Sequence, residues 1–241
     1  MNIKTSITNI KDDQEIIRGH KLEELVQTHS FVEVIYLLFT GKLPTASETK
    51  MLNALFVSAI DHGPGTVSAM TARISASSAN STHSALAAGI LGFGPRHGIA
   101  GEGAMEFFYK HADESDIADL VARLKEQKVR IPGYGHKVFT DVDPRSLTLF
   151  DIAKNLGIFG KHSEFALSVK EELNKISSKP LPLNIDGTFA AILCDMGFDV
   201  RMGQSFFLIA RTPGLLAQIH EEQINDVGIR RLEEDEIEFV D

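Results

Sequence analysis

The chain has 241 residues, of which 43% are hydrophobic and 24% charged, a composition typical of a folded globular protein and not of a disordered or fibrous one. Its net charge of −9 excludes nucleic acid as a main partner, because such binding depends on Lys and Arg side chains that neutralise phosphates. The single cysteine, Cys194, excludes an internal disulfide, and no signal-peptide pattern or bilayer-length apolar run is present, so we expect a cytoplasmic protein that does not enter the membrane.

Two capping boxes predict where the first helices begin. Ser30 precedes Glu33 by three residues, and Thr45 precedes Glu48 by the same spacing, so that hydroxyl and glutamate can each pair with a backbone N–H at the helix start. Apolar residues follow at helical spacing, and we expect both helices to pack into the core. These residues are Phe31, Val34, Ile35, Leu38 and Phe39 in the first helix, which should end at Gly41, and Leu52, Leu55, Phe56 and Ile60 in the second.

Residues 67–91 are dominated by Ala, Ser and Gly. Small side chains allow close helix packing, so we expect buried central helices here, with the bulk supplied by Met70, Ile74, Leu86, Ile90 and Leu91. A flexible Ser-rich linker is the alternative interpretation. The alanine content and the helical spacing favour the helices.

Further helices are predicted at residues 102–111, 116–126, 144–156, 163–176, 187–196 and 202–223. No series of alternating strands is apparent, so the predicted fold class is all-α. Loops rich in Gly or Pro interrupt the helices at residues 92–103, 131–144 and 178–186. Because loops on a rigid helical scaffold commonly carry function, these loops are where we expect the chemistry.

Three histidines lie beside glycines in loop-like segments: His62, His97 and His136. Glycine permits close approach of a ligand to the backbone, so these positions favour function over a structural role. The histidines lack the spacing of metal ligands, and the chain has no nucleophile elbow, so neither a metal site nor a nucleophilic serine is predicted. General acid–base chemistry remains.

Acid–base chemistry needs a carboxylate in a constrained position, and Asp186 lies at the end of a proline-bearing loop, just before an apolar helix. The alternative is that Asp186 only caps that helix, since Asp is a preferred N-cap residue. Arg145 and Arg211 are candidates for holding a substrate carboxylate, because a guanidinium binds a carboxylate through two hydrogen bonds. Exposed or capping arginines are the alternative.

A basic cluster stands out in this acidic chain: Lys125, Lys128, Arg130 and Lys137 surround the loop at 131–137, with only Glu126 against them. A ligand that carries phosphates could bind there. A solvated basic face is the alternative interpretation, and on the residues alone it is the better one.

Together these segments resemble the citrate synthase superfamily over most of the chain. The resemblance rests on Arg18-Gly19-His20, on SFVEVIYLLFTGKLPT at 30–45, and on five later motifs in the family's order: GFGPRHG at 92–98, GYGHKVF at 133–139, DPR at 143–145, NIDG at 184–187 and RTPGLLAQIHE at 211–221. One short helix here joins segments that a long helical block separates in full-length citrate synthases. The chain is thus similar to the compact citryl-CoA lyases, and residues 61–64 and 184–187 look like the citryl-CoA lyase module of ATP citrate lyase.

The resemblance implies a citrate synthase-like helical fold with a large and a small lobe that lacks part of the usual large-domain helices. Residues 1–241 would form one unit, with the small lobe at about 101–200. A homodimer or larger assembly is implied, as are a coenzyme A thioester as substrate and no permanently bound cofactor or metal. The loop at 131–137 looks like the family's CoA-binding segment, through Ile131, Gly133, Tyr134, Gly135 and Lys137. This gives the basic cluster a purpose, because CoA carries phosphates.

The resemblance also implies the roles of the site residues. Asp186 would exchange a proton with the acetyl methyl group, His97 would hydrogen-bond the thioester oxygen, and His136 would serve the oxaloacetate carbonyl or, in cleavage, take the hydroxyl proton of citryl-CoA. The substrate carboxylates would be held by His62, Arg145, Arg211 and Arg231, with Arg231, which lies next to Arg230, reaching across a dimer interface.

The short chain and the two lyase-like motifs favour cleavage of citryl-CoA to acetyl-CoA and oxaloacetate. His97, which the module of ATP citrate lyase lacks, favours the alternative, a synthase that condenses acetyl-CoA with oxaloacetate or another 2-oxo acid. A helical interaction subunit without activity is a third hypothesis.

Overall fold

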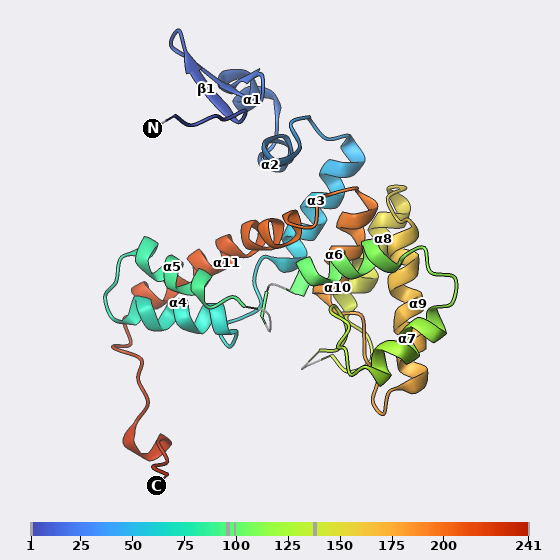
Figure 1. The fold of residues 1–241 in the computed structure, drawn as a ribbon. Helices are drawn as coiled ribbons and strands as arrows, with labels where there is room; N and C mark the ends of the chain where they lie inside the picture. The colour runs from blue at the N-terminus through green and yellow to red at the C-terminus, as the bar shows by residue number, and fades with distance from the viewer. Residues whose placement is uncertain (1, 95–96, 99, 137–138, 241) are drawn as a thin grey trace.

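The computed structural model describes residues 2–94, 97–98, 100–136 and 139–240. These residues form a mostly helical protein with a small sheet at the N-terminus (Figure 1). The elements are β1 (Thr8–Lys11), β2 (Gln14–Ile17), β3 (His20–Lys21), α1 (Leu22–Thr28), α2 (Phe31–Thr40), α3 (Ala46–Ala59), α4 (Val67–Ser77), α5 (Thr82–Leu91), α6 (Ala100–His111), α7 (Ile117–Glu126), α8 (Pro144–Asn155), α9 (Lys161–Ile176), α10 (Ile185–Asp195), α11 (Met202–Asn225) and a short 3₁₀ helix (Glu234–Glu236).

The N-terminal sheet and helix α1, which follows it, are parts of the fold that the sequence patterns do not predict. The strands of the sheet are antiparallel in the order β1-β2-β3, and β1 and β2 are joined by the two-residue turn Asp12-Asp13. Both turn residues have positive φ, 54° and 58°, as a tight hairpin of this length requires. The strands have only two or four residues, and three of the four residues of β1 are exposed. They are therefore too short to show an alternating pattern of buried and exposed residues.

Both capping boxes form as predicted. The backbone N–H of Ser30 donates to Glu33 Oε2 at 2.7 Å, and Thr45 and Glu48 pair in the same way. Helix α2 ends at Gly41, whose φ of 76° suits glycine. The expected packing is wrong for Phe31, the first residue of α2, which is 78% exposed, and for Ile60, which is 44% exposed just past the end of α3.

Helix α10 lies at the centre of the main core. It is buried on every side from Thr188 to Cys194, and α6, α8, α9 and α11 pack around it (Figure 1). An apolar helix without a polar face is what such a central position requires. The range 101–200 covers α6 to α10, and its assignment as a small lobe stays a prediction.

Helices α4, α5 and the second half of α11 form a separate bundle with its own small core (Figure 1). The predicted close packing is confirmed: a Cβ on Gly89 of α5 would lie 2.9 Å from the Cβ of Ala72 in α4. The linker alternative is therefore wrong. The expectation that large side chains supply the buried bulk here holds for Leu86, which packs against the small core, and is wrong for the other four, because alanines of α4 and α5 line that core. Exposed fractions are 48% for Met70, 46% for Ile74, 38% for Ile90 and 85% for Leu91.

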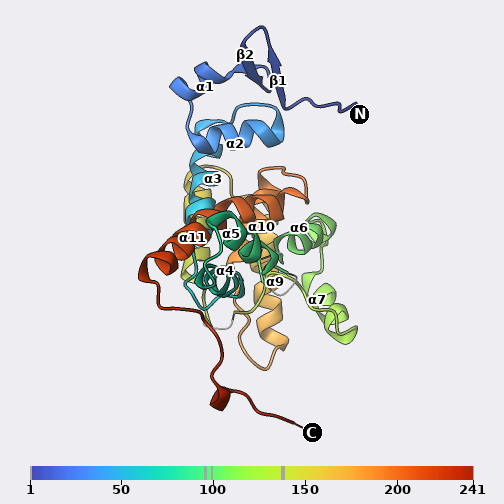
Figure 2. The ribbon, with the colours of Figure 1, turned by 90° about the vertical axis from the view of Figure 1, so that its left-hand side faces the viewer.

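After α11 the chain leaves the body as an extended C-terminal arm, residues 226–240 (Figures 1 and 2). Its apolar side chains are exposed, among them Leu232 at 65% and Phe239 at 86%. Within the described residues, none of the helices combines the length and the apolar character needed to cross a lipid bilayer.

Candidate active site

A glycine-to-glycine contact joins the loop at 131–136 to the start of α10. Gly133 has a φ of +88°, and a Cβ on it would lie 2.7 Å from the Cα of Gly187. Asn184 strengthens the junction, because its backbone N–H donates to Gly133 O and its Nδ2 donates to Gly135 O, both at 2.9 Å. The two segments that carry His136 and Asp186 are thus fixed to each other.

Asp186 is not the cap of α10, so that alternative is wrong. Asn184 holds the cap position and accepts the backbone N–H of Gly187 on its Oδ1 at 3.0 Å. Asp186 is the second residue of the helix, and its carboxyl is available for other contacts. Burial raises the pKa of Asp186, while the positive charges of Arg145 and Arg211 act in the opposite direction. The acid therefore holds its proton to a higher pH than an exposed aspartate does.

Arg145 is held in place by Asp143, a fully buried carboxylate at the N-cap of α8. Arg145 donates to it from Nε at 3.0 Å and from NH2 at 2.7 Å, a two-pronged ion pair. The guanidinium also reaches His136, with NH2 3.5 Å from Nε2. The sequence motif at 143–145 includes Asp143, but no role was predicted for it, although an Asp before a Pro at the first helical position signals an N-cap.

His62 and His136 come together with their ring centroids 5.9 Å apart. Burial is the main cause that lowers the pKa of each histidine, and Arg145 lowers it further, whereas at His136 the carboxylate of Asp143 acts in the opposite direction. A lowered pKa favours the neutral ring at pH 7. The backbone N–H of Phe139 donates to His136 Nδ1 at 3.0 Å, so in this tautomer Nε2 carries the ring proton.

Arg211 lies in α11 and is only 3% exposed. Its Nε donates to Ala59 O at 2.6 Å, and its guanidinium lies 5.0 Å from the ring centre of Phe207. Burial lowers the pKa of Arg211, whereas the carboxylates of Asp61 and Asp186 raise it. A buried guanidinium of this kind is suited to receive a carboxylate ligand.

His97 is held in place by Ser68 of α4. Its Nε2 accepts the backbone N–H of Ser68 at 3.3 Å and lies 2.9 Å from Ser68 Oγ, so the ring proton belongs on Nδ1. The ring stacks on Phe93 at 5.3 Å between centroids, and Phe93 packs edge-on against Phe207 below Arg211. Ser68 was missed in the sequence, where it is one serine among many.

The residues expected to bind CoA have mixed placements. Ile131 and Tyr134 are buried, and the Tyr134 hydroxyl donates to Ala166 O at 2.9 Å, so these side chains hold the loop from inside. The backbone N–H of Gly135 donates to Pro182 O at 2.7 Å. Lys137 lies outside the described residues. Of the basic cluster, Lys128 and Arg130 are exposed.

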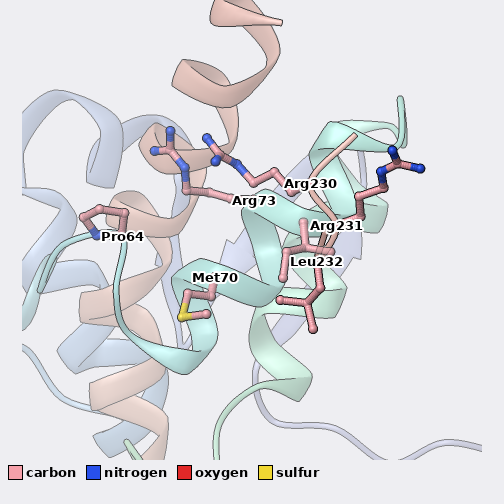
Figure 3. Close-up of a pocket in the computed structure, with 7 residues that line it drawn as sticks. Pro64, Met70, Arg73, Arg230, Arg231 and Leu232 are labelled. Carbon is pink, nitrogen blue, oxygen red and sulfur yellow. The ribbon is translucent and has the colours of Figure 1, made fainter. Parts of the chain in front are cut away.

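The structure thus brings together five of the predicted site residues: His62, His136, Arg145, Asp186 and Arg211. Arg231 lies apart from them on the C-terminal arm, where 75% of its side chain is exposed (Figure 3). Among the described residues, none of the His, Cys, Asp and Glu side chains form a group that could hold a metal ion. A buried carboxyl, two neutral histidines and two guanidiniums suit acid–base chemistry on an anionic substrate.

Comparison with known protein families shows to which family the chain belongs. The family model described as "Citrate synthase, C-terminal domain" matches residues 1–54 and 45–233. The chain belongs to the citrate synthase family. A member from Shewanella oneidensis, a 2-methylcitrate synthase, is 31% identical over 195 residues, which cover 80% of this chain and 52% of that protein. The chain spans about half the length of the curated relatives it matches.

Solved structures of this family include a match of nearly equal length. The structure of citryl-CoA lyase from Hydrogenobacter thermophilus is 43% identical, with a TM-score of 0.94 over 99% of this chain and 94% of that chain. ATP citrate lyase from Methanosaeta concilii, at 22% identity and a TM-score of 0.89, matches 100% of this chain with 42% of its own length and shares the fold. The predicted citrate synthase-like helical fold is confirmed, with the N-terminal sheet as an addition.

Proposed function

We propose that the protein is a citryl-CoA lyase, which cleaves citryl-CoA or a close analogue to acetyl-CoA and oxaloacetate. The observation that carries the proposal is the 43% identity to a citryl-CoA lyase along nearly the full length of both chains. The cluster of His62, His136, Arg145, Asp186 and Arg211 supports it, because these side chains offer acid–base groups beside cationic sites for the substrate carboxylates.

In the proposed cleavage, the hydroxyl proton of citryl-CoA passes to His136. The bond between the hydroxyl-bearing carbon and the CH₂ attached to the thioester carbonyl then breaks, which leaves the ketone of oxaloacetate and the enolate of acetyl-CoA. His97 donates a hydrogen bond from Nδ1 to the enolate oxygen, and protonated Asp186 delivers its proton to the CH₂ carbon. The raised pKa of Asp186 supports this role, because cleavage begins with the acid form.

One observation favours condensation as the second candidate function. With its Nδ1 accepting from Phe139, His136 carries its proton on Nε2, the nitrogen that can donate to a ketone oxygen. Cleavage needs the opposite tautomer, with Nε2 unprotonated and ready to take the hydroxyl proton. The geometry of this structure therefore suits the start of a reaction between acetyl-CoA and a 2-oxo acid such as oxaloacetate.

In the same proposal, positively charged side chains bind the negatively charged groups of the substrate. Arg145, Arg211 and neutral His62 would hold carboxylates and the hydroxyl group of the substrate. The loop at 131–137 would bind CoA, with Lys128 and Arg130 near its phosphates. A cytoplasmic location, consistent with the single thiol of Cys194, belongs to the proposal as well.

We also propose a homodimer. Helix α4 exposes Val67, Met70 and Ile74 at helical spacing, with 56%, 48% and 46% of each residue accessible. An apolar stripe of this kind is uncommon on a free surface and fits a second copy of the same helix across a two-fold axis. In such a dimer the exposed Arg231 of one chain would complete the carboxylate site of the other.

Three measurements separate the hypotheses. Purified protein incubated with citryl-CoA should release acetyl-CoA and oxaloacetate, and the absence of both products would reject the lyase. Release of free CoA from acetyl-CoA with oxaloacetate or another 2-oxo acid would instead identify a synthase. An inactive interaction subunit predicts no heat of CoA binding in calorimetry, so a clear binding isotherm would eliminate that hypothesis.

A further inference from the structure

A buried carboxylate lies where the C-terminal arm leaves the body. Glu222, in the last turns of α11, has a side chain that is only 1% exposed and is gripped by two arginines. Arg73 of α4 donates from Nε at 2.7 Å, and Arg230 of the arm donates from Nε at 2.5 Å and from NH2 at 2.9 Å. Figure 3 shows Arg73 and Arg230 next to each other, whereas Arg231 points away from them.

The two arginines make this burial favourable. A buried carboxylate is costly unless it is paired and hydrogen-bonded, and here both of its oxygens accept from guanidinium groups. The same contacts lower the pKa of Glu222, chiefly through Arg230, so the group stays ionised. The arm is further held by the backbone N–H of Arg230, which donates to Ser77 Oγ at 3.0 Å. Glu222 therefore ties α4, α11 and the arm together.

The ion pairs of Glu222 with Arg73 and Arg230 form a clamp. This clamp gives the adjacent residues Arg230 and Arg231 different roles. The guanidinium of Arg230 is occupied by Glu222. The side chain of Arg231 is 75% exposed, and its ion pair with Glu233 is long, at 3.8 Å. Both arginines line a groove of about 540 Å³ together with α4 residues, including Met70 and Ile74 of the exposed stripe. Arg231 is thus presented at the surface where a second copy is proposed to bind.

We propose that Glu222 is a positioning residue: by anchoring Arg230, it fixes the root of the arm and presents Arg231 to the substrate carboxylate in a second copy of the chain. This inference rests on the proposed function. It assigns to Glu222, Arg73 and Arg230 a role in the reaction although none of them touches substrate.

A double-mutant cycle tests the proposal with a matched control. Glu222→Gln keeps the shape and removes the charge, whereas Glu221→Gln removes the neighbouring, 60% exposed carboxylate, which contacts Arg73 but not Arg230. We expect Glu222→Gln to lower kcat/KM for citryl-CoA by about 10- to 100-fold, mainly through KM, and Glu221→Gln to stay within about twofold of the wild type. Adding Glu222→Gln to Arg231→Ala should cause little further loss, because both changes remove the same contact.

Additive losses in the cycle would overturn the proposal, because a role confined to stability would add to the loss of Arg231. Mixed dimers test delivery between chains. Asp186→Asn and Arg231→Ala protomers, each of strongly reduced activity alone, should regain about a quarter of wild-type activity after random mixing, since half of the dimers then contain one complete site. No recovery in dimers that exchange subunits would reject delivery to the second copy.

Limited proteolysis tests the anchor without any activity, so it distinguishes failure of this inference from failure of the proposed function. Trypsin cleaves after Arg230, and the ion pair with Glu222 should shield this bond because it withholds the Arg230 side chain from the protease. We expect Glu222→Gln to speed cleavage after Arg230 at least about tenfold, with Glu221→Gln close to the wild type. Equal cleavage rates in all three proteins would overturn the anchor, whether or not the wild type cleaves citryl-CoA.

Discussion

At the start of α10, Asn184 and Asp186 have separate roles: Asn184 caps the helix, and the carboxyl of Asp186 is left for the proposed chemistry. Asn184 caps the helix and ties it to the loop at 133–135, so Asp186 has no capping duty. Its partly buried carboxyl faces Arg145 and Arg211, and burial outweighs their attraction in setting the direction of its pKa shift. An acid whose pKa is raised in a cationic site is suited to proton exchange with carbon.

Asp186→Asn should slow turnover strongly while leaving the fold intact. The amide cannot give or take the proton at the CH₂ carbon, so we expect kcat for cleavage of citryl-CoA to fall by about 10²–10⁴-fold, the usual worth of a positioned acid or base. CoA binding in calorimetry should change little. Asp151→Asn, at an exposed position on α8, is the matched control and should retain activity. Turnover of Asp186→Asn near the wild-type rate would assign the proton transfer to another group.

The same substitution should stabilise the protein in a pH-dependent manner. Because the pKa of Asp186 is raised in the folded state, the folded protein binds this proton more tightly than the unfolded chain, and stability falls as the pH rises through the two values. Asp186→Asn removes that loss, so we expect it to be more stable than the wild type by about 1 kcal/mol at pH 7, with the difference vanishing near pH 4. Thermal denaturation at both pH values measures this, and a larger advantage at pH 4 would contradict it.

At the scale of elements, local patterns predicted the helices well, because the signals that start and stop a helix are local. The two capping boxes and Gly41 marked their boundaries, and the six later helices begin and end within about two residues of the expected positions. The contact between Gly133 and Gly187 was not predictable, since each glycine by itself indicates only a flexible position. Their need for glycine arises from the other segment, 54 positions away in the chain.

Gly187→Ala should damage the site and the stability together. A Cβ at Gly187 would lie 2.6 Å from Gly133 O and 2.7 Å from Leu183 Cδ1, so the loop and helix must move apart. We expect a loss of about 1–3 kcal/mol of stability from overpacking and a fall in kcat of up to about 10²-fold, because Asp186 is the preceding residue. Denaturant unfolding and steady-state kinetics measure both effects.

Gly101→Ala is the control for that substitution. It lies in α6, where the nearest heavy atoms to a new Cβ would be 4.0 Å away. Alanine also favours a helix over glycine, so this variant should equal or exceed the wild type in stability. If both variants lost the same stability and activity, the glycine-to-glycine contact would not be what holds the site.

At the scale of the whole molecule, the sequence could not distinguish residues that pack within the chain from residues that stay exposed on its surface. Met70 and Ile74 have helical spacing, and this pattern is the same for a buried face and for an exposed apolar face. The alanines of α4 fill the inner face instead, because close approach of α5 leaves no room there for larger side chains. The arm was equally unpredictable, since its position depends on Glu222 and Arg73, distant contacts in α11 and α4.

A charge on the exposed stripe of α4 should dissociate the proposed dimer and disable its sites. Ile74→Glu would place a carboxylate from each copy in the apolar interface, where it lacks water and a partner. We expect the dimer dissociation constant to rise by about 10²-fold or more, and kcat/KM to fall in parallel because separated chains cannot exchange Arg231. Val26→Glu, at a 74% exposed apolar residue of α1 far along the chain from the stripe, should leave both quantities unchanged. Analytical ultracentrifugation with kinetics at matched concentrations measures them, and an Ile74→Glu protein that sediments and turns over like the wild type would place the interface elsewhere.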